Sequence, residues 1–332
     1  MGTKKTFITV IIDAYGRKQF LKGAIVSALN QSLSKSKYEI IVIKNFKDRN
    51  LDSFIKKNHI KSVFSTKVKV GAFIMDALKT SKGNVISFLD DDDRFTKDKL
   101  THVYNDFEND SRLLFYHNNY KVINETGNTI NNMNDKNRYK NLKKKVFIHK
   151  LFNNSSICVR RNLLTSNLWT LRALNLSIDT LSLVLAIKNK GGIKIDDAEL
   201  TFYRIHGSNS NINLIGKNAL LTEFIEKKIL LYKKYLEDSE LFYELSIGTD
   251  FEKYFRRFSI ESKFKYNIYS SINNPKMKSS VTLSDYGFLL SPPDSQSIIL
   301  VLWSLFPRAI KKMLVNRLMR SRRMQVSSMQ KV

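Results

Sequence analysis

The chain has 332 residues, enough for one large domain or two of ordinary size, and its composition of 42% hydrophobic and 26% charged residues is typical of a globular protein. Its single cysteine, Cys158, excludes a disulfide within the chain and fits a reducing compartment. The net charge of +26 indicates an anionic partner, such as nucleic acid, anionic lipid or a phosphorylated substrate. Because the charge is spread along the chain, it does not choose among these partners.

The first third of the sequence alternates apolar runs with amphipathic stretches. Buried strands are predicted at residues 7–12, 38–43, 62–65 and 85–89, and helices at residues 17–29, 71–79 and 100–107. The lysines before residue 7 precede a short apolar run that ends at Asp13, so we expect a first strand there and not a signal peptide. The alternation predicts a mostly parallel sheet with helices on both faces, in which ligands bind beyond the carboxyl ends of the strands.

The middle of the chain continues this pattern, and the last third changes to long helices. Strands are predicted at residues 113–123 and 155–160, a polar loop at 125–145, a helix at 178–190, and a short strand that runs into a loop at 200–211. From about residue 214, apolar residues recur at the spacing of long amphipathic helices.

The tail, about residues 297–323, combines an apolar run with a basic stretch. The apolar residues 297–306 would measure roughly 15 Å as a helix, about half of a bilayer core, so this run is too short to cross a membrane. The basic residues that follow are Arg308, Lys311, Lys312, Arg317, Arg320, Arg322 and Arg323. This pattern suits an amphipathic anchor at a membrane surface. The alternative is a helix that packs on the protein's own core.

Four consecutive aspartates, residues 90–93, follow the predicted strand at 85–89. Such a concentration of charge is unfavourable without a cation, because like charges in contact repel by about 1 kcal/mol even in water. Mg²⁺ and Mn²⁺ take carboxylate oxygens and often hold phosphates at the same time, so these residues could bind a nucleotide diphosphate through a metal. The alternative is an acidic turn that caps the following helix, a role for which Asp93 or Thr96 is suited.

Five segments, in this order, resemble glycosyltransferase family 2: TVIIDAYGRKQFLKGAIVSALNQS, YEIIVI, GNVISFLDDDDRFTKDKL, LSIDT and YRIHGSN. The resemblance covers roughly residues 7–211. It implies the GT-A fold, a Rossmann-like α/β domain that binds nucleotide-diphospho-sugars, and sugar transfer with inversion. It divides the chain into a GT-A domain at 1–212 and a helical C-terminal region at 213–332. Within the domain, about 1–124 would form the nucleotide-sugar half and 146–212 the acceptor half.

The resemblance also assigns residues to the nucleotide sugar and to a divalent metal. Nucleotide-sugar contacts are expected at Ala14, Tyr15, Arg17, Asn45, Asp90 and Asp91. Tyr15 matches a position where the family often stacks a ring on the base; the alternative is an ordinary tyrosine at a strand end. Asp91 matches the carboxylate that contacts ribose. Asp92 matches the one that binds Mn²⁺ or Mg²⁺ beside the diphosphate, and His206 matches a position that approaches the metal or the diphosphate.

Asp179, in LSIDT, matches the family's catalytic base. One group must take the proton from the acceptor hydroxyl as it attacks the anomeric carbon, while the metal stabilises the leaving diphosphate. The alternative is that Asp179 caps the helix that starts there, since aspartate is a favoured N-cap.

The chain departs from the family pattern at two places. The pair before Tyr15 is Asp13 and Ala14, where the family usually has Pro-Thr or a similar pair. After the second strand, Lys44 and Asn45 stand where the family usually has an aspartate that contacts the base. Asn45 offers a different pattern of donors and acceptors, which leaves the identity of the nucleotide open.

Together these features predict an inverting, metal-dependent glycosyltransferase that moves a sugar from a nucleotide-diphosphate donor to a hydroxyl of a glycan. The tail suggests a lipid-linked acceptor and a peripheral position at the cytoplasmic face of the cell membrane. One alternative is a polyprenyl-phosphate glycosyltransferase of the same fold, whose anionic acceptor needs no general base. Another is a non-catalytic basic protein that binds nucleic acid through its charge. The nucleic-acid alternative leaves the aspartates unexplained, because carboxylates repel phosphates when no metal lies between them.

Overall fold

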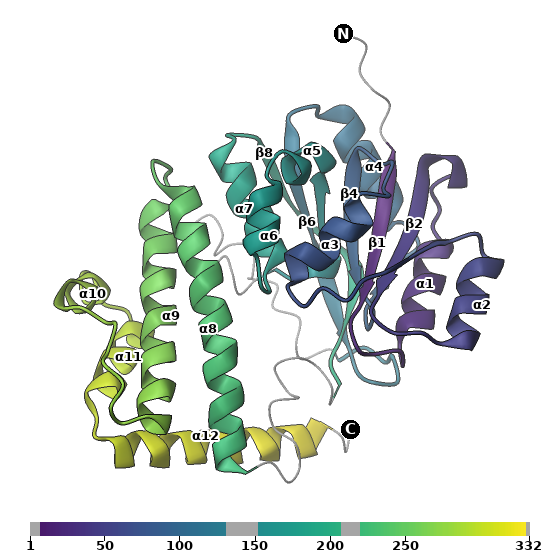
Figure 1. Cartoon of the computed structure of the whole chain (residues 1–332). Coiled ribbons are helices and arrows are strands. Elements are labelled where there is room, and N and C mark those ends of the chain that lie inside the picture. The colour runs from purple at the N-terminus through teal and green to yellow at the C-terminus, as the bar shows by residue number, and fades with distance from the viewer. Residues whose placement is uncertain (1–6, 131–151, 207–219, 330–332) are drawn as a thin grey trace. The chain divides into compact units, whose positions relative to one another are not determined.

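The computed structural model of the chain describes residues 7–130, 152–206 and 220–329, with side chains described up to residue 321. The chain divides into two compact units, Met1–Ile205 and His206–Val332 (Figure 1). The predicted domain boundary at residue 212 and most of the predicted loop at 125–145 lie outside the described residues.

One mixed sheet organises the first unit. In chain order its strands are β1 (Ile8–Ala14), β2 (Tyr38–Lys44), β3 (Lys61–Phe64), β4 (Val85–Asp90), β5 (Arg94–Phe95), β6 (Leu113–Ile123), β7 (Ile157–Arg160) and β8 (Gly192–Arg204). Their order across the sheet is β3-β2-β1-β4-β7-β6-β8-β5. Strands β3, β2, β1 and β4 are parallel to one another, and β6 is parallel to β8. Strand β7 is antiparallel to both of its neighbours, β4 and β6, and β5 is antiparallel to β8. The prediction of a mostly parallel sheet is confirmed.

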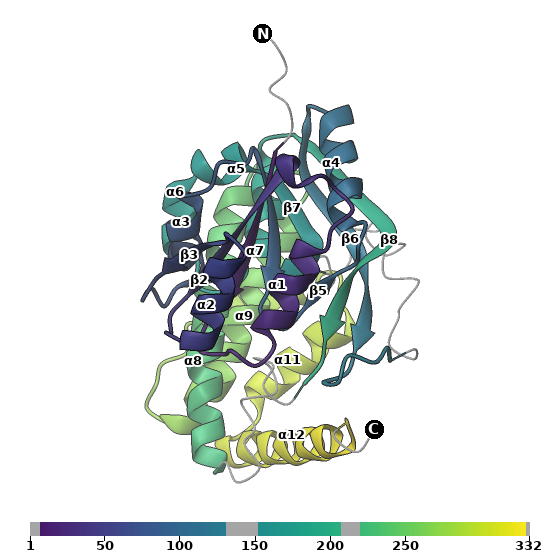
Figure 2. The same ribbon diagram turned by 90° about the vertical axis from the view of Figure 1, so that its right-hand side faces the viewer.

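Helices cover both faces of this sheet (Figure 1, Figure 2). They are α1 (Leu21–Leu29), α2 (Arg49–Lys57), α3 (Val70–Leu78), α4 (Lys99–Asn109), α5 (Arg161–Thr165), α6 (Leu168–Ala173) and α7 (Ile178–Lys188). Helices α1, α2 and α4 share one core with alternate residues of β1, Ile8, Val10 and Ile12, while α3, α6 and α7 lie on the opposite face. Ile11 of β1 is also completely buried. The strand is therefore buried on both faces, which explains its continuous apolar run.

Strand β8 is longer than the sequence indicates. A short strand is predicted from residue 200, but the strand begins at Gly192 and pairs in parallel with β6 along most of its length. Its first half is only partly buried, so it lacks the apolar run that would indicate a strand.

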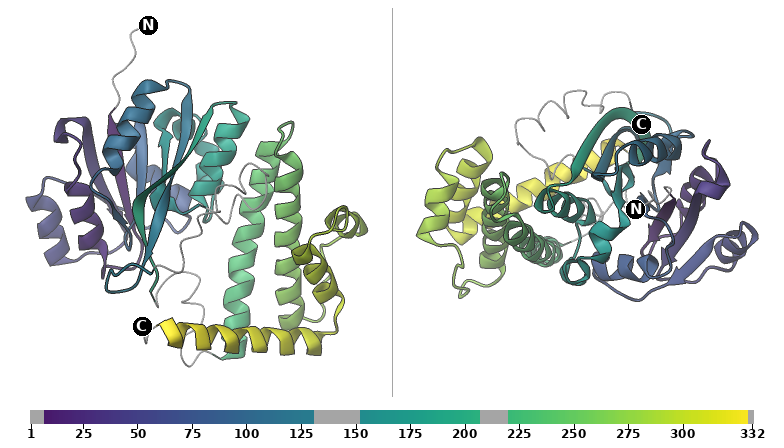
Figure 3. Two further views of the ribbon diagram at one scale, coloured as in Figure 1. Left: turned by 180° about the vertical axis from the view of Figure 1, so that it is seen from behind. Right: turned by 90° about the horizontal axis from the view of Figure 1, so that it is seen from above.

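The second unit is helical, as predicted. Its helices are α8 (Leu221–Ser246), α9 (Glu252–Asn273), α10 (Leu283–Leu289), α11 (Ser295–Leu305) and α12 (Arg308–Met329). Helices α8 and α9 lie side by side as an antiparallel pair (Figure 3), and Gly248 in the turn between them has a φ of 77°, a left-handed conformation that favours glycine. Phe264 and Ile268 of α9, Leu300 of α11 and Val315 of α12 share one buried core.

The predicted tail, residues 297–323, forms most of α11 and the first part of α12. Each helix packs one face into the core of the unit, through Leu300 on α11 and Val315 on α12. The side chains of Arg322 and Arg323 lie outside the described residues. Across the part of the chain that the structure describes, no helix is both long enough and apolar enough to cross a bilayer.

Candidate active site

The aspartate run lies at the carboxyl ends of the central strands. Strands β1 and β4 are parallel neighbours, and their register pairs Asp13 with Asp90. The chain then turns, and the backbone N–H of Asp93 donates to the carbonyl of Asp90 at 3.2 Å. Asp91, Asp92 and Asp93 are only 3%, 6% and 1% exposed. The parallel strands therefore bring five carboxyl groups, three of them buried, to one end of the sheet.

The aspartates do not cap the next helix. Helix α4 begins at Lys99 with Asp98 in the N-cap position, and Asp98 makes no side-chain cap hydrogen bond. The interpretation of Asp93 or Thr96 as a helix cap is therefore wrong, and the buried charge needs another explanation.

The positive charge of Arg17, which pairs with Asp91 and Asp92, compensates these carboxyl groups only in part. Burial raises the pKa of Asp90 to about 7, and the negative charge of Asp92 adds to the rise. Burial also raises the pKa of Asp91 to about 7, although the guanidinium of Arg17 opposes it. The pKa of Asp93 is raised well above its ordinary value by burial and then by the charges of Asp92 and Asp90. A bound cation would favour the ionised forms and relieve their repulsion.

A divalent cation fits the donor atoms of this cluster. Carboxylate oxygens of Asp90, Asp92 and Asp93 lie within 4.8 Å of one another. Among the described residues, Oδ2 of Asp91 and Oδ2 of Asp93 are buried without a hydrogen-bond partner. Mg²⁺ and Mn²⁺ prefer carboxylate oxygens as ligands, so the residues present fit a hard divalent metal.

Arg17 is held against the cluster by the loop that follows β1. Its Nη2 lies 2.5 Å from Asp91 Oδ1, and its Nη1 lies 2.9 Å from Asp92 Oδ2. In the same loop, Gly16 has a φ of 70° and donates its backbone N–H to Asn45 Oδ1 at 2.7 Å. Asn45 therefore positions the loop that carries Arg17, whether or not it also makes the base contact predicted for it.

Asn154 is a site residue that the sequence does not reveal. Its Nδ2 donates to Asp90 Oδ1 at 2.7 Å and to Asp13 Oδ1 at 3.2 Å. The next residue, Ser155, accepts a hydrogen bond from the backbone N–H of Asp90 at 2.9 Å. Both residues lie in a 3₁₀ turn, Asn154–Ser156, just before β7. An Asn-Ser-Ser stretch has no chemical signature of its own, and only the pairing of β7 with β4 brings it to the aspartates.

Arg204, the last residue of β8, holds the aspartate turn in place. Its backbone N–H donates to Asp93 Oδ1 and its Nε donates to the carbonyl of Asp92, both at 2.8 Å. Its Nη1 donates to the carbonyls of Asn124 and Glu125. Arg204 thus ties the turn to the end of β6, which fixes the direction in which the carboxylates point.

Asp179 is the second residue of α7 and is partly exposed. The N-cap of this helix is Ser177, so the alternative that Asp179 caps the helix is wrong. Its Oδ1 accepts the backbone N–H of Thr180 at 2.7 Å. The pKa of Asp90 is raised mainly by burial and by the charge of Asp92, and the negative charge of Asp179 adds to this rise. Asp179 therefore lies near enough to the cluster to act on it electrostatically.

The other predicted residues lie at the end of β1 and at the start of the second unit. Ala14 is completely buried, whereas Tyr15 is 48% exposed and has its ring edge-on to Phe73, with 5.6 Å between the ring centroids. An exposed aromatic ring is available for stacking on a base. His206 is buried and is the first residue of the second unit, so its approach to the metal stays a prediction.

Part of this chain is similar in sequence to known glycosyltransferases. The sequence model of Glycosyl transferase family 2 matches residues 9–167. An uncharacterized glycosyltransferase of Rickettsia bellii is 30% identical over 131 residues, which cover 38% of this chain and 19% of that protein. The poly(ribitol-phosphate) beta-glucosyltransferase of Bacillus spizizenii is 30% identical over 108 residues, which cover 30% of this chain and 17% of that protein. The chain therefore covers about a fifth of the length of these curated relatives.

Two solved structures share the fold. The mannosyltransferase PcManGT from Pyrobaculum calidifontis, in complex with GDP-Man and Mn²⁺, has a TM-score of 0.55 at 11% identity, over 95% of this chain and 88% of that chain. TarS 1–349 of S. aureus, in complex with UDP-GlcNAc, has a TM-score of 0.51 at 15% identity, over 96% of this chain and 92% of that chain. Identities this low show the fold alone, which is the GT-A-like fold expected from the sequence. The sequence of residues 9–167 is therefore similar to glycosyltransferase family 2, and the chain shares its fold with these two proteins.

Proposed function

We propose that the chain is an inverting glycosyltransferase that moves a sugar from a nucleotide-diphosphate donor to a hydroxyl of a glycan. The observation that carries this proposal is the group of buried aspartates at the carboxyl ends of β1 and β4, near the further carboxylate of Asp179. Ligands of open α/β sheets bind at this end of the strands. The family match supports the proposal, as do the nucleotide sugars bound to the two proteins of the same fold.

The nucleotide of the donor would bind across the ends of β1 and β2. The exposed ring of Tyr15 suits stacking on the base, and the carboxylate of Asp91 suits hydrogen bonds from ribose hydroxyls. The Nδ2 group of Asn45 would donate to an acceptor atom of the base. Ala14 has no long side chain to obstruct the nucleotide, and Arg17 offers a guanidinium to a phosphate.

Asp92, together with Asp90 and Asp93, would hold a Mn²⁺ or Mg²⁺ ion, with His206 as a further candidate ligand. The oxygens of the three aspartates form the compact group that such an ion prefers. When bound, the ion stabilises the negative charge of the leaving diphosphate. The protein would orient these carboxylates for the ion, and the hydrogen bond that Asn154 donates to Asp90 contributes to this orientation.

Asp179 would act as the general base. Its carboxylate takes the proton of the acceptor hydroxyl while the hydroxyl oxygen forms a bond to the anomeric carbon of the sugar. The bond from that carbon to the diphosphate oxygen breaks, and the nucleoside diphosphate leaves with the electron pair. Attack opposite the leaving group inverts the configuration of the anomeric carbon.

A lipid-linked acceptor at the cytoplasmic face of the membrane fits the C-terminal region. Residues 295–332 contain no aspartate or glutamate, and their lysines and arginines suit the anionic surface of that leaflet. The same basic region favours a polyprenyl phosphate as the second candidate acceptor. Its phosphate is already ionised, so that reaction would need no general base.

Thermal unfolding with a panel of nucleotide diphosphates, with and without Mn²⁺, tests the donor site. A ligand that binds only the native state adds about 2.7 kcal/mol of stability at a hundredfold excess over its Kd. We expect a metal-dependent shift with one nucleotide in the wild type and none in Asp92→Asn. Asp98→Asn changes an exposed aspartate just outside the cluster and should keep the shift. Absence of a shift with every nucleotide, in folded wild-type protein, would overturn the proposal.

A further inference from the structure

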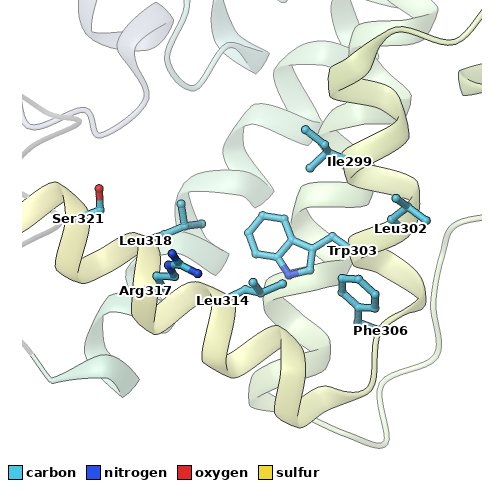
Figure 4. Close-up of a pocket in the computed structure, with 8 residues that line it drawn as sticks. All are labelled: Ile299, Leu302, Trp303, Phe306, Leu314, Arg317, Leu318 and Ser321. Atoms are coloured by element: carbon cyan, nitrogen blue, oxygen red, sulfur yellow. The ribbon is translucent and has the colours of Figure 1, made fainter.

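A groove runs between the last two helices of the second unit (Figure 4). It has a volume of about 490 Å³ and is lined by α11 and α12. Ile299 and Leu302 of α11 line it, as does Phe306, the residue after this helix. Leu318 lines it from α12, with Arg317 beside it. Apart from Arg317, a serine and the indole nitrogen of a tryptophan, the lining side chains are apolar.

Helix α11 carries apolar side chains on two faces. Leu300 is buried in the core of the unit, whereas Ile299, Leu302 and Leu305 are 59%, 51% and 66% exposed. Met313 continues the exposed apolar residues on α12. A single exposed apolar residue is ordinary, but a group of them around an apolar groove marks an interaction site.

Basic residues accompany this apolar surface, and the sequence around it contains no acidic ones. Residues 295–332 have no aspartate or glutamate, and Arg308, Lys312, Arg317 and Arg320 of α12 are exposed. Two copies of such a surface would repel each other, and a nucleic acid would leave the apolar side chains uncovered. A surface that is both apolar and basic instead complements an anionic lipid.

We propose that α11 and α12 form a binding site for an anionic phospholipid of a membrane surface. One acyl chain occupies the groove, Arg317 pairs with the phosphate of its headgroup, and the other basic residues of α12 contact neighbouring headgroups. With 11 residues, α11 is about 16 Å long, so it lies in the interface and does not span the bilayer. This inference rests on the membrane contact proposed above but not on the transfer of sugar.

Trp303 provides a second, independent feature of the groove. Its ring lies on the wall of the groove, and its Nε1 is buried without a hydrogen-bond partner among the described residues. The apolar ring is the part of this side chain that an acyl chain in the groove would contact. Tryptophan is common at the membrane–water interface, because its side chain combines an apolar ring with one polar group.

Co-sedimentation of the full chain with vesicles, without nucleotide, tests the site. We compare vesicles of phosphatidylcholine with vesicles in which phosphatidylglycerol replaces part of it, and expect tight binding only to the second. The double variant Leu302→Gln and Leu318→Gln changes two exposed side chains of the groove and should weaken this binding at least about tenfold. Leu230→Gln changes an exposed leucine of α8 and, as the matched control, should bind like the wild type.

Fluorescence shows whether the groove itself meets the lipid. In the variant Trp169→Phe, Trp303 is the single tryptophan, and its emission should move to shorter wavelength when phosphatidylglycerol vesicles are added. Equal binding of the wild type and the double variant would overturn the proposal, because adsorption would then depend on charge alone. Loss of a dimer in the double variant, with no vesicle binding by the wild type, would instead assign the surface to a second copy. The nucleotide-induced thermal shift reports separately on the transferase site.

Discussion

Nη1 of Arg17 lies 2.9 Å from Oδ2 of Asp92, so the chain's own guanidinium sits at the carboxylate proposed to bind the metal. A metal ion at Asp92 has to share this oxygen with Arg17 or displace it. Replacing Arg17 by Gln removes a positive charge from the neighbourhood of the ion and should raise the affinity for Mn²⁺, without nucleotide, by about tenfold. Titration of Mn²⁺ followed by electron paramagnetic resonance measures this affinity.

Arg17→Lys is the control for that prediction. It keeps the positive charge but loses the planar fork that contacts Asp91 and Asp92 together, so its affinity for Mn²⁺ should lie close to that of the wild type. Unchanged affinity in Arg17→Gln would contradict the prediction and would mean that the ion and the guanidinium use different oxygens.

Removal of Asn154 should destabilise the first unit. In Asn154→Ala, Asp13 and Asp90 lose their shared hydrogen-bond donor and still face each other across β1 and β4. We expect a loss of about 1–3 kcal/mol in the free energy of unfolding, measured with urea. The matched control is Asn153→Ala, because both polar side-chain atoms of Asn153 lack a hydrogen-bond partner in the described part of the chain. A loss no greater than that of the control would show that the bridge contributes nothing to stability.

The centre of the fold could be predicted because its strands are buried on both faces. Such strands carry mostly apolar residues, so β1, β2 and β4 appear in the sequence as nearly continuous apolar runs such as FITVII. The position of the aspartates follows from the same signal, since residues 90–93 come at the end of one of these runs.

Features that depend on tertiary pairing could not be predicted. Asn154 reaches the aspartates only because β7 is antiparallel to β4, a reversal that no local pattern indicates. The first half of β8 is partly exposed, so its residue types do not distinguish it from a loop. The ion pairs of Arg17 likewise depend on a loop held from the neighbouring strand by Asn45.

Lys99 is a buried charge next to the site, held by polar groups of the sheet. It is completely buried, and its Nζ donates to the carbonyl of Ser155 and to Thr201 Oγ1. The Nζ also lies 4.2 Å from the centre of the Phe95 ring. Two hydrogen bonds and a ring only partly replace the water that an ammonium group loses on burial.

The stability of the protein should therefore rise with pH around the pKa of Lys99. Burial lowers this pKa from 10.5 to about 8, although the charges of Cys158 and Asp93 oppose the change. Between these two values the unfolded chain holds the proton and the folded chain does not, so the free energy of unfolding rises by up to about 3 kcal/mol. In Lys99→Met this rise disappears. Denaturant unfolding at pH 7 and pH 10 measures the difference between wild type and variant, and a difference independent of pH would contradict the prediction.

Asp179→Asn separates donor binding from transfer. The amide keeps an Oδ1 that can accept the backbone N–H of Thr180, but it cannot take a proton from an acceptor. We expect an unchanged nucleotide-induced thermal shift and a fall in kcat of about 10²–10⁴-fold with a hydroxyl acceptor. Asp197→Asn, at an exposed aspartate of β8, should keep full activity. Normal turnover of a hydroxyl acceptor by Asp179→Asn would exclude Asp179 as the base, whereas activity kept only with a polyprenyl phosphate would identify the acceptor that needs none.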